Sequence, residues 1–234
     1  MKIIARVRSD FPTKFGIPRQ SGLVPELKAR IVFEPEYRNP DAVRGLDQFS
    51  YIWLLWQFSE ALRDTWSPTV RPPRLGGNTR VGVFASRSPF RPNSLGLSSV
   101  RLDKIDLDSD LGPVLYISGG DLMDGTPVFD IKPYLPYVDS HPDAEGGFTD
   151  QTREYGLRVD IPECLMGYVP EEKRAALAAV LANDPRPSYQ NDPSRVYGFF
   201  FAGLEVRFTV ADGVLCVCEI VKNGGPARAD WCRS

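Results

Sequence analysis

The sequence is poor in the residue types that build the commonest catalytic and metal-binding sites. It has a single histidine, His141, and four cysteines, none of them in a C-x-x-C pair. A zinc site and a Ser-His-Asp triad are therefore not expected, because both depend on histidine or on paired cysteines. The sequence also lacks a G-x-G-x-x-G segment after an expected strand and a Walker-type loop. If the chain is an enzyme, its chemistry must rest on positioning and on arginine, aspartate or main-chain groups.

Long apolar runs are missing as well. No run approaches the length that a membrane span needs, and the apolar stretch after Met1 is too short for a signal peptide. Cysteines without paired spacing fit a reducing compartment. We therefore expect a globular protein of the cytoplasm, with no membrane and no metal as partner.

What the sequence does have is a basic block followed by an acidic block. Residues 63–101 contain seven arginines and one acidic residue, whereas residues 103–150 contain eleven acidic residues and two lysines. The net charge of −2 hides this division. A local arginine cluster suits an anionic partner such as nucleic acid. The alternative is that the two blocks pair with each other across the fold.

Alternating apolar residues predict a mainly β structure for the first two thirds of the chain. Strands are expected at 3–7, 28–33, 50–58, 81–85, 98–102 and 114–117. Segment 50–58 is so uniformly apolar that it predicts a central strand buried on both faces. Asn39 and Gly45 frame one short helical turn. Short strands with proline- and glycine-rich connections favour a single-sheeted β-barrel, which we place at residues 1–145.

The remaining residues, 146–234, are expected to form a small α+β domain. Segment 170–182 predicts a helix, with proline at its start and acidic residues in its first turn. Strands are expected at 196–201, 204–210 and 215–221, and Ala211-Asp-Gly213 predicts a hairpin between the last two. This domain is also a candidate for contact with nucleic acid.

Arginine next to proline recurs along the chain. Arg87 and Arg91 lie in the proline-containing segment between two apolar runs, and Arg19 and Arg186 each follow a proline directly. Proline fixes the backbone, and a rigidly presented guanidinium suits carboxylate or phosphate. Tyr189, close to Arg186, is suited to stacking on a base. The alternative is that these arginines are solvated residues of surface loops.

The segment 119–137 contains a second candidate site. Its Asp124-Gly-Thr-Pro127 turn offers main-chain amides and the Thr126 hydroxyl to a ligand. A purely structural turn is the alternative. Asp130 and Lys132 share one face of an expected strand, where they are able to pair.

Several of these segments occur together in one known family. The matching segments are PRQ at 18–20, DAVRGL at 41–46, WSPTVRPPRLGG at 66–77, GVFASRSPFRPN at 82–93, DGTP at 124–127, DIKPYLP at 130–136 and DPRP at 184–187. In these segments, and in their order over most of the chain, the sequence resembles the TsaA-like (TrmO) family of S-adenosylmethionine-dependent tRNA methyltransferases.

The resemblance implies a fold, a reaction and partners. It implies a single β-barrel that binds S-adenosylmethionine without a Rossmann loop, followed by a small C-terminal domain, in a homodimer with the cofactor near the subunit interface. It implies N6-methylation of threonylcarbamoyladenosine next to the anticodon of tRNA. Alternatives are a barrel of this kind that methylates another small acceptor, and a non-catalytic module that binds S-adenosylmethionine or RNA.

The resemblance also implies site residues. Cofactor contacts fall on Pro18, Arg19, Gln20, Ser59, Glu60, Arg87, Leu97, Asp124, Gly125, Thr126 and Pro127. Ser59 and Glu60 stand where members of the family have His-Gln, a departure that bears on cofactor affinity. Substrate contacts are expected at Arg71, Arg74, Arg91, Asp184, Arg186 and Tyr189. Asp124 is the candidate base that assists proton loss from N6, with water or the substrate itself as alternatives.

Overall fold

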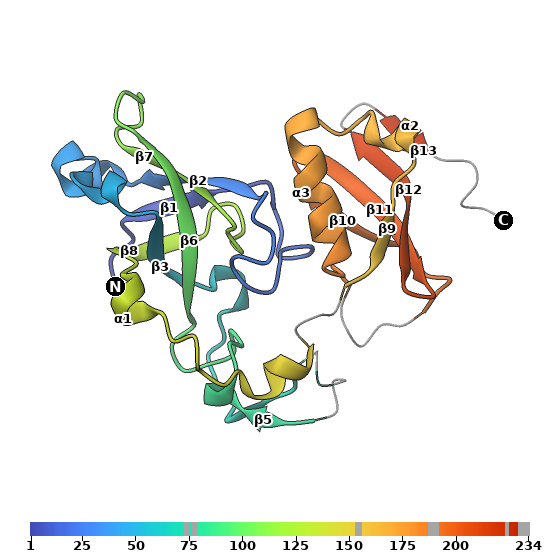
Figure 1. Ribbon diagram of the computed structural model, residues 1–234, viewed down its shortest axis with the longest axis horizontal. Helices are drawn as coiled ribbons and strands as arrows, with labels where there is room; N and C mark the ends of the chain where they lie inside the picture. Colours follow the sequence, from blue (N-terminus) through green and yellow to red (C-terminus); the bar gives the residue numbers. More distant parts are fainter. Residues whose placement is uncertain (73–74, 76–78, 153–155, 187–191, 223–224, 229–234) are drawn as a thin grey trace.

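The computed structural model describes residues 1–72, 75, 79–152, 156–186, 192–222 and 225–228 (Figure 1). Within these residues the structure is mainly β and contains two main sheets, drawn on the left and right of Figure 1. None of the helices in this part of the chain is long and apolar enough to cross a membrane.

The first sheet is a closed six-stranded barrel, which confirms the barrel expected from the sequence. The strand order around it is β1-β2-β7-β6-β3-β8, and every pair is antiparallel. The strands are β1 (Ala5–Arg8), β2 (Lys28–Phe33), β3 (Tyr51–Gln57), β6 (Leu95–Asp106), β7 (Val114–Ser118) and β8 (Pro127–Pro133). Closure leaves no free edge between these strands.

Apolar residues that alternate along the strands fill the interior of the barrel. Val7, Ile31, Leu54, Leu115 and Val128 are fully buried there. Strand β3 does not fit the expectation of burial on both faces. Its burial alternates residue by residue, and Trp53 and Leu55 on its outer face stay partly exposed. That prediction was wrong because the outer face of β3 lines a cavity and is not covered by another layer.

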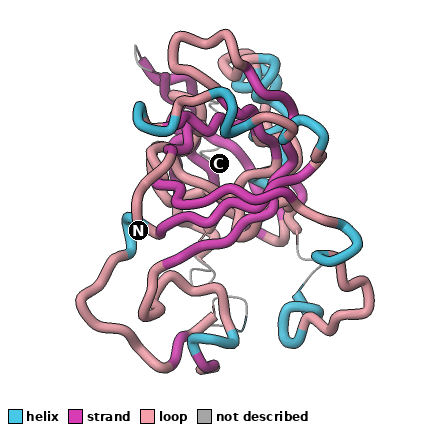
Figure 2. Tube along the Cα trace, turned by 90° about the vertical axis from the view of Figure 1, so that its left-hand side faces the viewer, coloured by secondary structure: helices cyan, strands magenta, loops and turns pink. Residues whose placement is uncertain are grey.

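Short 3-10 turns and a two-stranded sheet lie in the connections between the barrel strands. Asn39 caps the expected turn, since its side-chain oxygen accepts a hydrogen bond from the Asp41 N–H at 3.0 Å. The strand expected at 81–85 is wrong beyond its first two residues: β5 (Val81–Gly82) pairs with β4 (Thr69–Val70), and the chain then turns into η6 (Val83–Ala85). The other turns are η1 (Pro35–Tyr37), η2 (Pro40–Val43), η3 (Leu46–Gln48), η4 (Ser59–Ala61), η7 (Gly147–Thr152) and the one-turn helix α1 (Pro136–Asp139). The chain between β3 and β6 extends away from the barrel and carries the β4–β5 pair with it (Figures 1 and 2).

The second sheet forms the core of the C-terminal part. Its order is β10 (Tyr197–Phe201), β11 (Leu204–Ala211), β12 (Val214–Lys222) and β13 (Gly225–Arg228), with β9 (Arg158–Asp160) parallel to β12. The β11–β12 hairpin turns at Asp212 and Gly213, both with positive φ, as Ala211-Asp-Gly213 predicts. Helix α3 (Glu171–Ala182), preceded by the short α2 (Glu163–Met166), buries Leu177 and Leu181 in the apolar core of this part. Helix α3 confirms the expected helix.

The loop between β1 and β2 joins the two parts of the molecule. Figure 1 shows this loop, in blue, between the barrel and the C-terminal sheet. Phe11, Val24 and Leu27 from the loop are buried in the same apolar cluster as helix α3 and strands β10 to β12. The core of the C-terminal part therefore includes residues from the N-terminal end of the chain.

Candidate functional site

The structure contains a large cavity on the outer side of the barrel, with a volume of about 900 Å³. The outer faces of β3 and β6 form one wall, and the β1–β2 loop and the segment before β6 form the others. A volume of this size suits a nucleoside-sized ligand. Nine residues expected from the resemblance line the cavity, and they come from five separate segments: Pro18, Arg19, Gln20, Ser59, Glu60, Arg87, Arg91, Leu97 and Thr126.

The apolar wall of the cavity comes from paired positions on β3 and β6. Leu55 lies opposite Leu97 in the strand register, and Trp53 precedes Leu55 by two residues on the same face. Gly96 lies opposite Trp56, and a Cβ at this glycine would come within 2.2 Å of the indole ring. Glycine is therefore needed here for the indole of Trp56 to lie against the strand, and a flat apolar surface results.

Arginines from two loops provide the polar side of the cavity. Arg87 donates a hydrogen bond to the Gln20 side-chain oxygen, which links the β1–β2 loop to the segment before β6. Arg19 donates to the main-chain oxygen of Arg186 at 3.5 Å. Arg91 donates to the Ser86 main-chain oxygen at 3.0 Å and so braces its own loop. The proline-stiffened arginines Arg19, Arg87 and Arg91 thus meet at one cavity.

Two acidic residues line this cavity, Glu60, which is exposed, and Asp121, which is partly buried. Asp121 Oδ1 accepts a hydrogen bond from the Ser98 hydroxyl at 2.7 Å, and Ser98 Oγ in turn accepts one from Trp56 Nε1 at 3.0 Å. Burial raises the pKa of Asp121 above the usual value for aspartate, and it outweighs the lowering effect of the Ser98 hydrogen bond and the Arg87 charge. A cavity-lining carboxyl with a raised pKa is a candidate general base.

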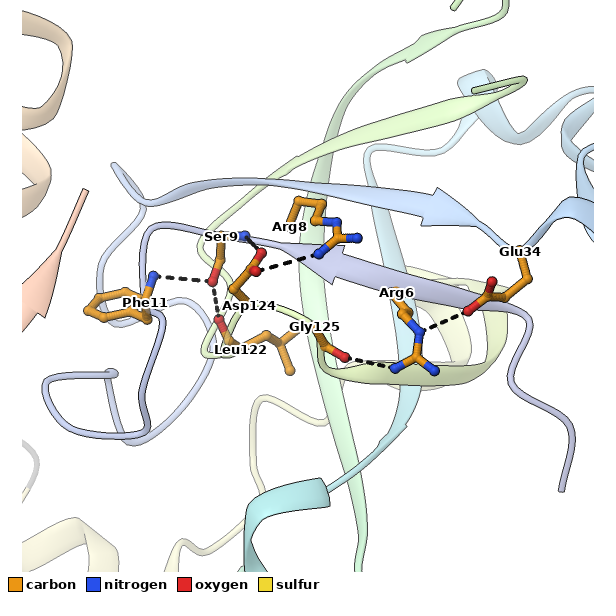
Figure 3. A network of polar contacts seen from close by, with 8 residues as sticks. All are labelled: Arg6, Arg8, Ser9, Phe11, Glu34, Leu122, Asp124 and Gly125. Carbon is orange, nitrogen blue, oxygen red and sulfur yellow. Dashed lines mark hydrogen bonds and ion pairs between the residues drawn. The ribbon is translucent and has the colours of Figure 1, made fainter. Parts of the chain in front are cut away.

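Asp124 lies close by in sequence but faces a different environment. One carboxylate oxygen accepts a hydrogen bond from the Ser9 N–H at 3.1 Å, and the other lies 3.5 Å from Arg8 Nη1 (Figure 3). Asp124 is not among the residues that line the cavity. Its carboxylate holds the end of β1 against the 121–126 turn.

The rest of the Asp124 turn is built by contacts to β1. Gly125 has a positive φ of 78° and donates its N–H to the Val7 main-chain oxygen at 2.9 Å. The Gly125 main-chain oxygen accepts from Arg6 Nη1 at 3.3 Å, and Arg6 also pairs with Glu34 at 2.8 Å (Figure 3). Thr126 lines the cavity, whereas Pro127 begins β8. Of residues 124–127, Thr126 is the one that lines the cavity.

The expected substrate residues fall into three groups. Arg91 lines the cavity, and Arg71 is exposed outside it. Asp184 and Arg186 form a two-point ion pair at 2.8 and 2.9 Å, with both side chains only 7% exposed. Arg74 and Tyr189 lie outside the residues that the structure describes. The guanidinium of Arg186 is therefore buried, although its main-chain oxygen reaches Arg19.

Charge pairing across the fold is limited among the described residues. Lys132 pairs with Asp130 at 2.9 Å, as their shared strand face predicts. From the arginine block, Arg101 lies 3.7 Å from Asp103, and Arg63 instead stacks over the Phe90 ring at 3.7 Å. No group of three or more histidine, cysteine, aspartate or glutamate side chains forms a candidate metal site within the described ranges.

Sequence reasoning did not single out Trp53, Leu55 and Asp121. A signal for the first two was present, because strand 51–57 is apolar on both faces although a barrel strand needs only one apolar face. Asp121 carried no such signal, since the Asp-Gly-Thr-Pro turn and the resemblance both pointed to Asp124 instead.

Comparisons with known proteins show which family the chain belongs to. Residues 6–140 match the family described as tRNA-methyltransferase O N-terminal domain, and residues 167–223 match the TrmO C-terminal domain. The chain is 41% identical over 217 residues to the tRNA (adenine(37)-N6)-methyltransferase of Escherichia coli K12, covering 89% of this chain and 92% of the relative. The chain belongs to the tRNA-methyltransferase O family.

Two further members of the family are similar over nearly the whole chain. A putative S-adenosylmethionine-dependent methyltransferase, RcsF, of Pseudomonas aeruginosa is 40% identical, covering 88% of this chain and 90% of the relative. The crystal structure of TrmO from Pseudomonas aeruginosa superposes with a TM-score of 0.74 at 33% identity, covering 93% of this chain and 96% of that one. The fold and both of its parts are therefore those of the family.

Proposed function

We propose that this protein transfers a methyl group from S-adenosylmethionine to N6 of adenosine 37 in tRNA, and that the acceptor carries a threonylcarbamoyl group. The cavity on β3 and β6 carries this proposal, because an apolar wall, arginines and a buried carboxyl face one another there. The named activity of the Escherichia coli relative supports the same reaction.

The donor site fits the residues that line the cavity. S-adenosylmethionine supplies an electrophilic methyl group on a sulfonium, together with an adenine ring and an amino-acid carboxylate. Trp53, Leu55 and Leu97 offer the flat apolar surface that a ring needs. Arg87, held by Gln20, offers a guanidinium for the carboxylate. We assign the donor contacts to Pro18, Arg19, Gln20, Ser59, Glu60, Arg87, Leu97 and Thr126.

The acceptor brings negative charge to the same region. A threonylcarbamoyl group ends in a carboxylate, and the anticodon loop adds phosphates. Arg91 in the cavity and Arg71 outside it are placed to meet these groups. Because such contacts release counterions, we expect the affinity for tRNA to fall steeply with salt.

Asp121 takes the proton in this proposal. The N6 nitrogen forms a bond to the methyl carbon, the carbon–sulfur bond breaks with its electron pair going to sulfur, and the N6 proton passes to the Asp121 carboxylate. The raised pKa of Asp121 makes it a better base than an ordinary aspartate. The hydrogen bond from Ser98 holds the carboxylate in place during the transfer.

We further propose that the protein works as a homodimer in the cytoplasm, where tRNA is available. Large apolar side chains are exposed beside the cavity: Phe84 is 72% exposed and Leu97 is 57% exposed. A second copy that covers them would close the cavity against water. Light scattering of the purified protein should give twice the mass of the chain, and a monomer at micromolar concentration would contradict this part of the proposal.

Mass spectrometry of tRNA nucleosides from a strain that lacks this protein tests the function. We expect methylated threonylcarbamoyladenosine to disappear and its unmethylated form to accumulate, with recovery when the gene is restored. An unchanged nucleoside profile would overturn the proposed function.

A further inference from the structure

We propose that the C-terminal domain sets the position of the β1–β2 loop, and with it the affinity of the cavity for the methyl donor, and that Lys173 acts in this as a positioning residue. The inference rests on the proposed function. It concerns residues 9–27, which we call the β1–β2 loop, and the contacts on its two sides.

One side of the loop is built into the C-terminal domain. Phe11 packs against Phe201 with ring centroids 5.3 Å apart, and the Ala202 N–H donates to the Asp10 main-chain oxygen at 2.9 Å. Lys173 Nζ lies 2.5 Å from Asp10 Oδ2, and both side chains are mostly buried. The start of the loop is therefore held by an aromatic contact, a main-chain hydrogen bond and an ion pair.

The position of Lys173 is unusual for a lysine. It is the third residue of helix α3, where the positive end of the helix dipole disfavours a cation. Helix preference therefore does not explain this lysine, whereas pairing with Asp10 across the two parts of the molecule does. Its role is to hold the loop.

The other side of the loop faces the cavity. Lys14, Ile17, Pro18, Arg19 and Gln20 line it, and Ile17 also packs against the C-terminal core. The contact is close at Gly16, because a Cβ there would come within 2.3 Å of the Phe199 ring. The loop residues that we assign to the donor therefore contact the C-terminal domain on one side, while Gln20 is held on the barrel side by Arg87.

The same loop start also contacts the turn that carries Asp121. Ser9 Oγ donates to the Leu122 main-chain oxygen at 2.8 Å (Figure 3). The Asp124 N–H donates to the Phe11 main-chain oxygen at 2.8 Å. Leu122 directly follows Asp121. A single short segment, residues 9–11, thus connects the C-terminal domain to both the loop and the Asp121 turn.

Loosening this connection should weaken donor binding without touching the donor. If the loop then holds its binding geometry only about a fifth of the time, the apparent Kd rises about fivefold. The test compares Lys173→Met, Asp10→Asn and the conservative Lys173→Arg with wild type. Lys132→Met is the matched control, because its ion pair with Asp130 has a similar length, 2.9 Å, but lies within strand β8.

Isothermal titration with S-adenosylhomocysteine gives the Kd for each full-length variant, and steady-state kinetics gives the KM for donor and tRNA. We expect about a fivefold rise in Kd and in donor KM for Lys173→Met and Asp10→Asn. We expect values near wild type for Lys173→Arg and Lys132→Met, and an unchanged KM for tRNA in all four. Hydrogen exchange of the amides of residues 14–22 should become faster in Lys173→Met while the barrel strands stay protected.

Three results separate the failure of the inference from the failure of the proposed function. Wild-type affinity and wild-type exchange in both Lys173→Met and Asp10→Asn would overturn the inference alone. Exchange that becomes faster over the whole C-terminal domain would also overturn it, since Lys173 would then be a general stabilising residue. A wild-type protein that does not bind S-adenosylhomocysteine would overturn the proposed function and this inference with it.

Discussion

Replacing Asp121 by asparagine is expected to abolish most turnover while leaving the protein folded. Asparagine keeps a side-chain oxygen that can accept the 2.7 Å hydrogen bond from Ser98, so the contact from Trp56 through Ser98 is retained. What is lost is the ability to accept a proton. Loss of a general base costs about 10²- to 10⁴-fold in kcat.

The raised pKa of Asp121 also determines how this substitution changes the free energy of unfolding at each pH. Burial raises the pKa of Asp121 in the folded protein, so the folded state binds more protons than the unfolded state between the ordinary aspartate pKa, about 4, and the raised value. The free energy of unfolding therefore falls as pH rises through this window, and the ionised carboxylate destabilises the protein above it. Asp121→Asn should lack this fall and be at least as stable as wild type at neutral pH.

Single-turnover methyl transfer to modified tRNA, measured with saturating donor at a series of pH values from acidic to mildly alkaline, tests the role of Asp121. The wild-type rate should rise with pH as Asp121 loses its proton, and the asparagine variant should show a low rate without this rise. Urea titrations at the same pH values give the stability. A variant with wild-type turnover would refute the role of Asp121 as the base, and so would a large loss of stability that accounts for the loss of activity.

Three further changes test other parts of the structure. Asp124→Asn removes a half-exposed contact to Arg8 and should cost at most about 1 kcal/mol of stability, with turnover within about twofold of wild type. A loss of turnover as large as that for Asp121→Asn would show that Asp124 is the base. Gly16→Ala combines a φ of +88° with a close approach to Phe199 and should lower the free energy of unfolding by about 1–3 kcal/mol in a urea titration; unchanged stability would show that the loop does not press on this ring. Arg186→Ala leaves the buried Asp184 carboxylate without its 2.8 Å partner and should cost about 3–5 kcal/mol, measured by thermal and urea unfolding; weaker tRNA binding at unchanged stability would instead support direct contact between Arg186 and RNA.

Much of the fold follows from local patterns in the sequence. Period-two alternation predicts the strands at 28–33 and 114–117 nearly as the structure has them, and the Asp212-Gly213 turn predicts the β11–β12 hairpin. Strand β8 was harder to recognise, because it begins at a proline and contains Asp130 and Lys132. A closed barrel supplies hydrogen-bond partners to such a segment from both neighbours, which no local pattern reveals.

The candidate site, like the fold, could be predicted from the sequence only in part. Proline-stiffened arginines could be recognised one by one, and the structure brings Arg19, Arg87 and Arg91 to the cavity. The choice between Asp121 and Asp124 could not be made from the sequence. This choice depends on the contact between the end of β1 and the turn. The Ser9 N–H donates to Asp124, whereas Asp121 lines the cavity.

The sequence also did not indicate that the β1–β2 loop packs into the C-terminal core. Phe11 and Leu27 are ordinary apolar residues in a segment rich in glycine and proline, so the sequence gives no reason to assign them to the C-terminal core. Their burial there depends on contacts between residues more than 150 positions apart, such as Lys173 with Asp10. Packing between distant segments is set by the whole fold.

Transfer of a labelled methyl group by the purified protein tests the central claim most directly. The protein is incubated with methyl-labelled S-adenosylmethionine and with tRNA that either carries or lacks the threonylcarbamoyl group, and the nucleosides are then separated. We predict label on threonylcarbamoyladenosine alone, and only in the tRNA that carries this group. Label on another nucleoside, or none under conditions in which the protein binds the donor, would contradict the proposed reaction.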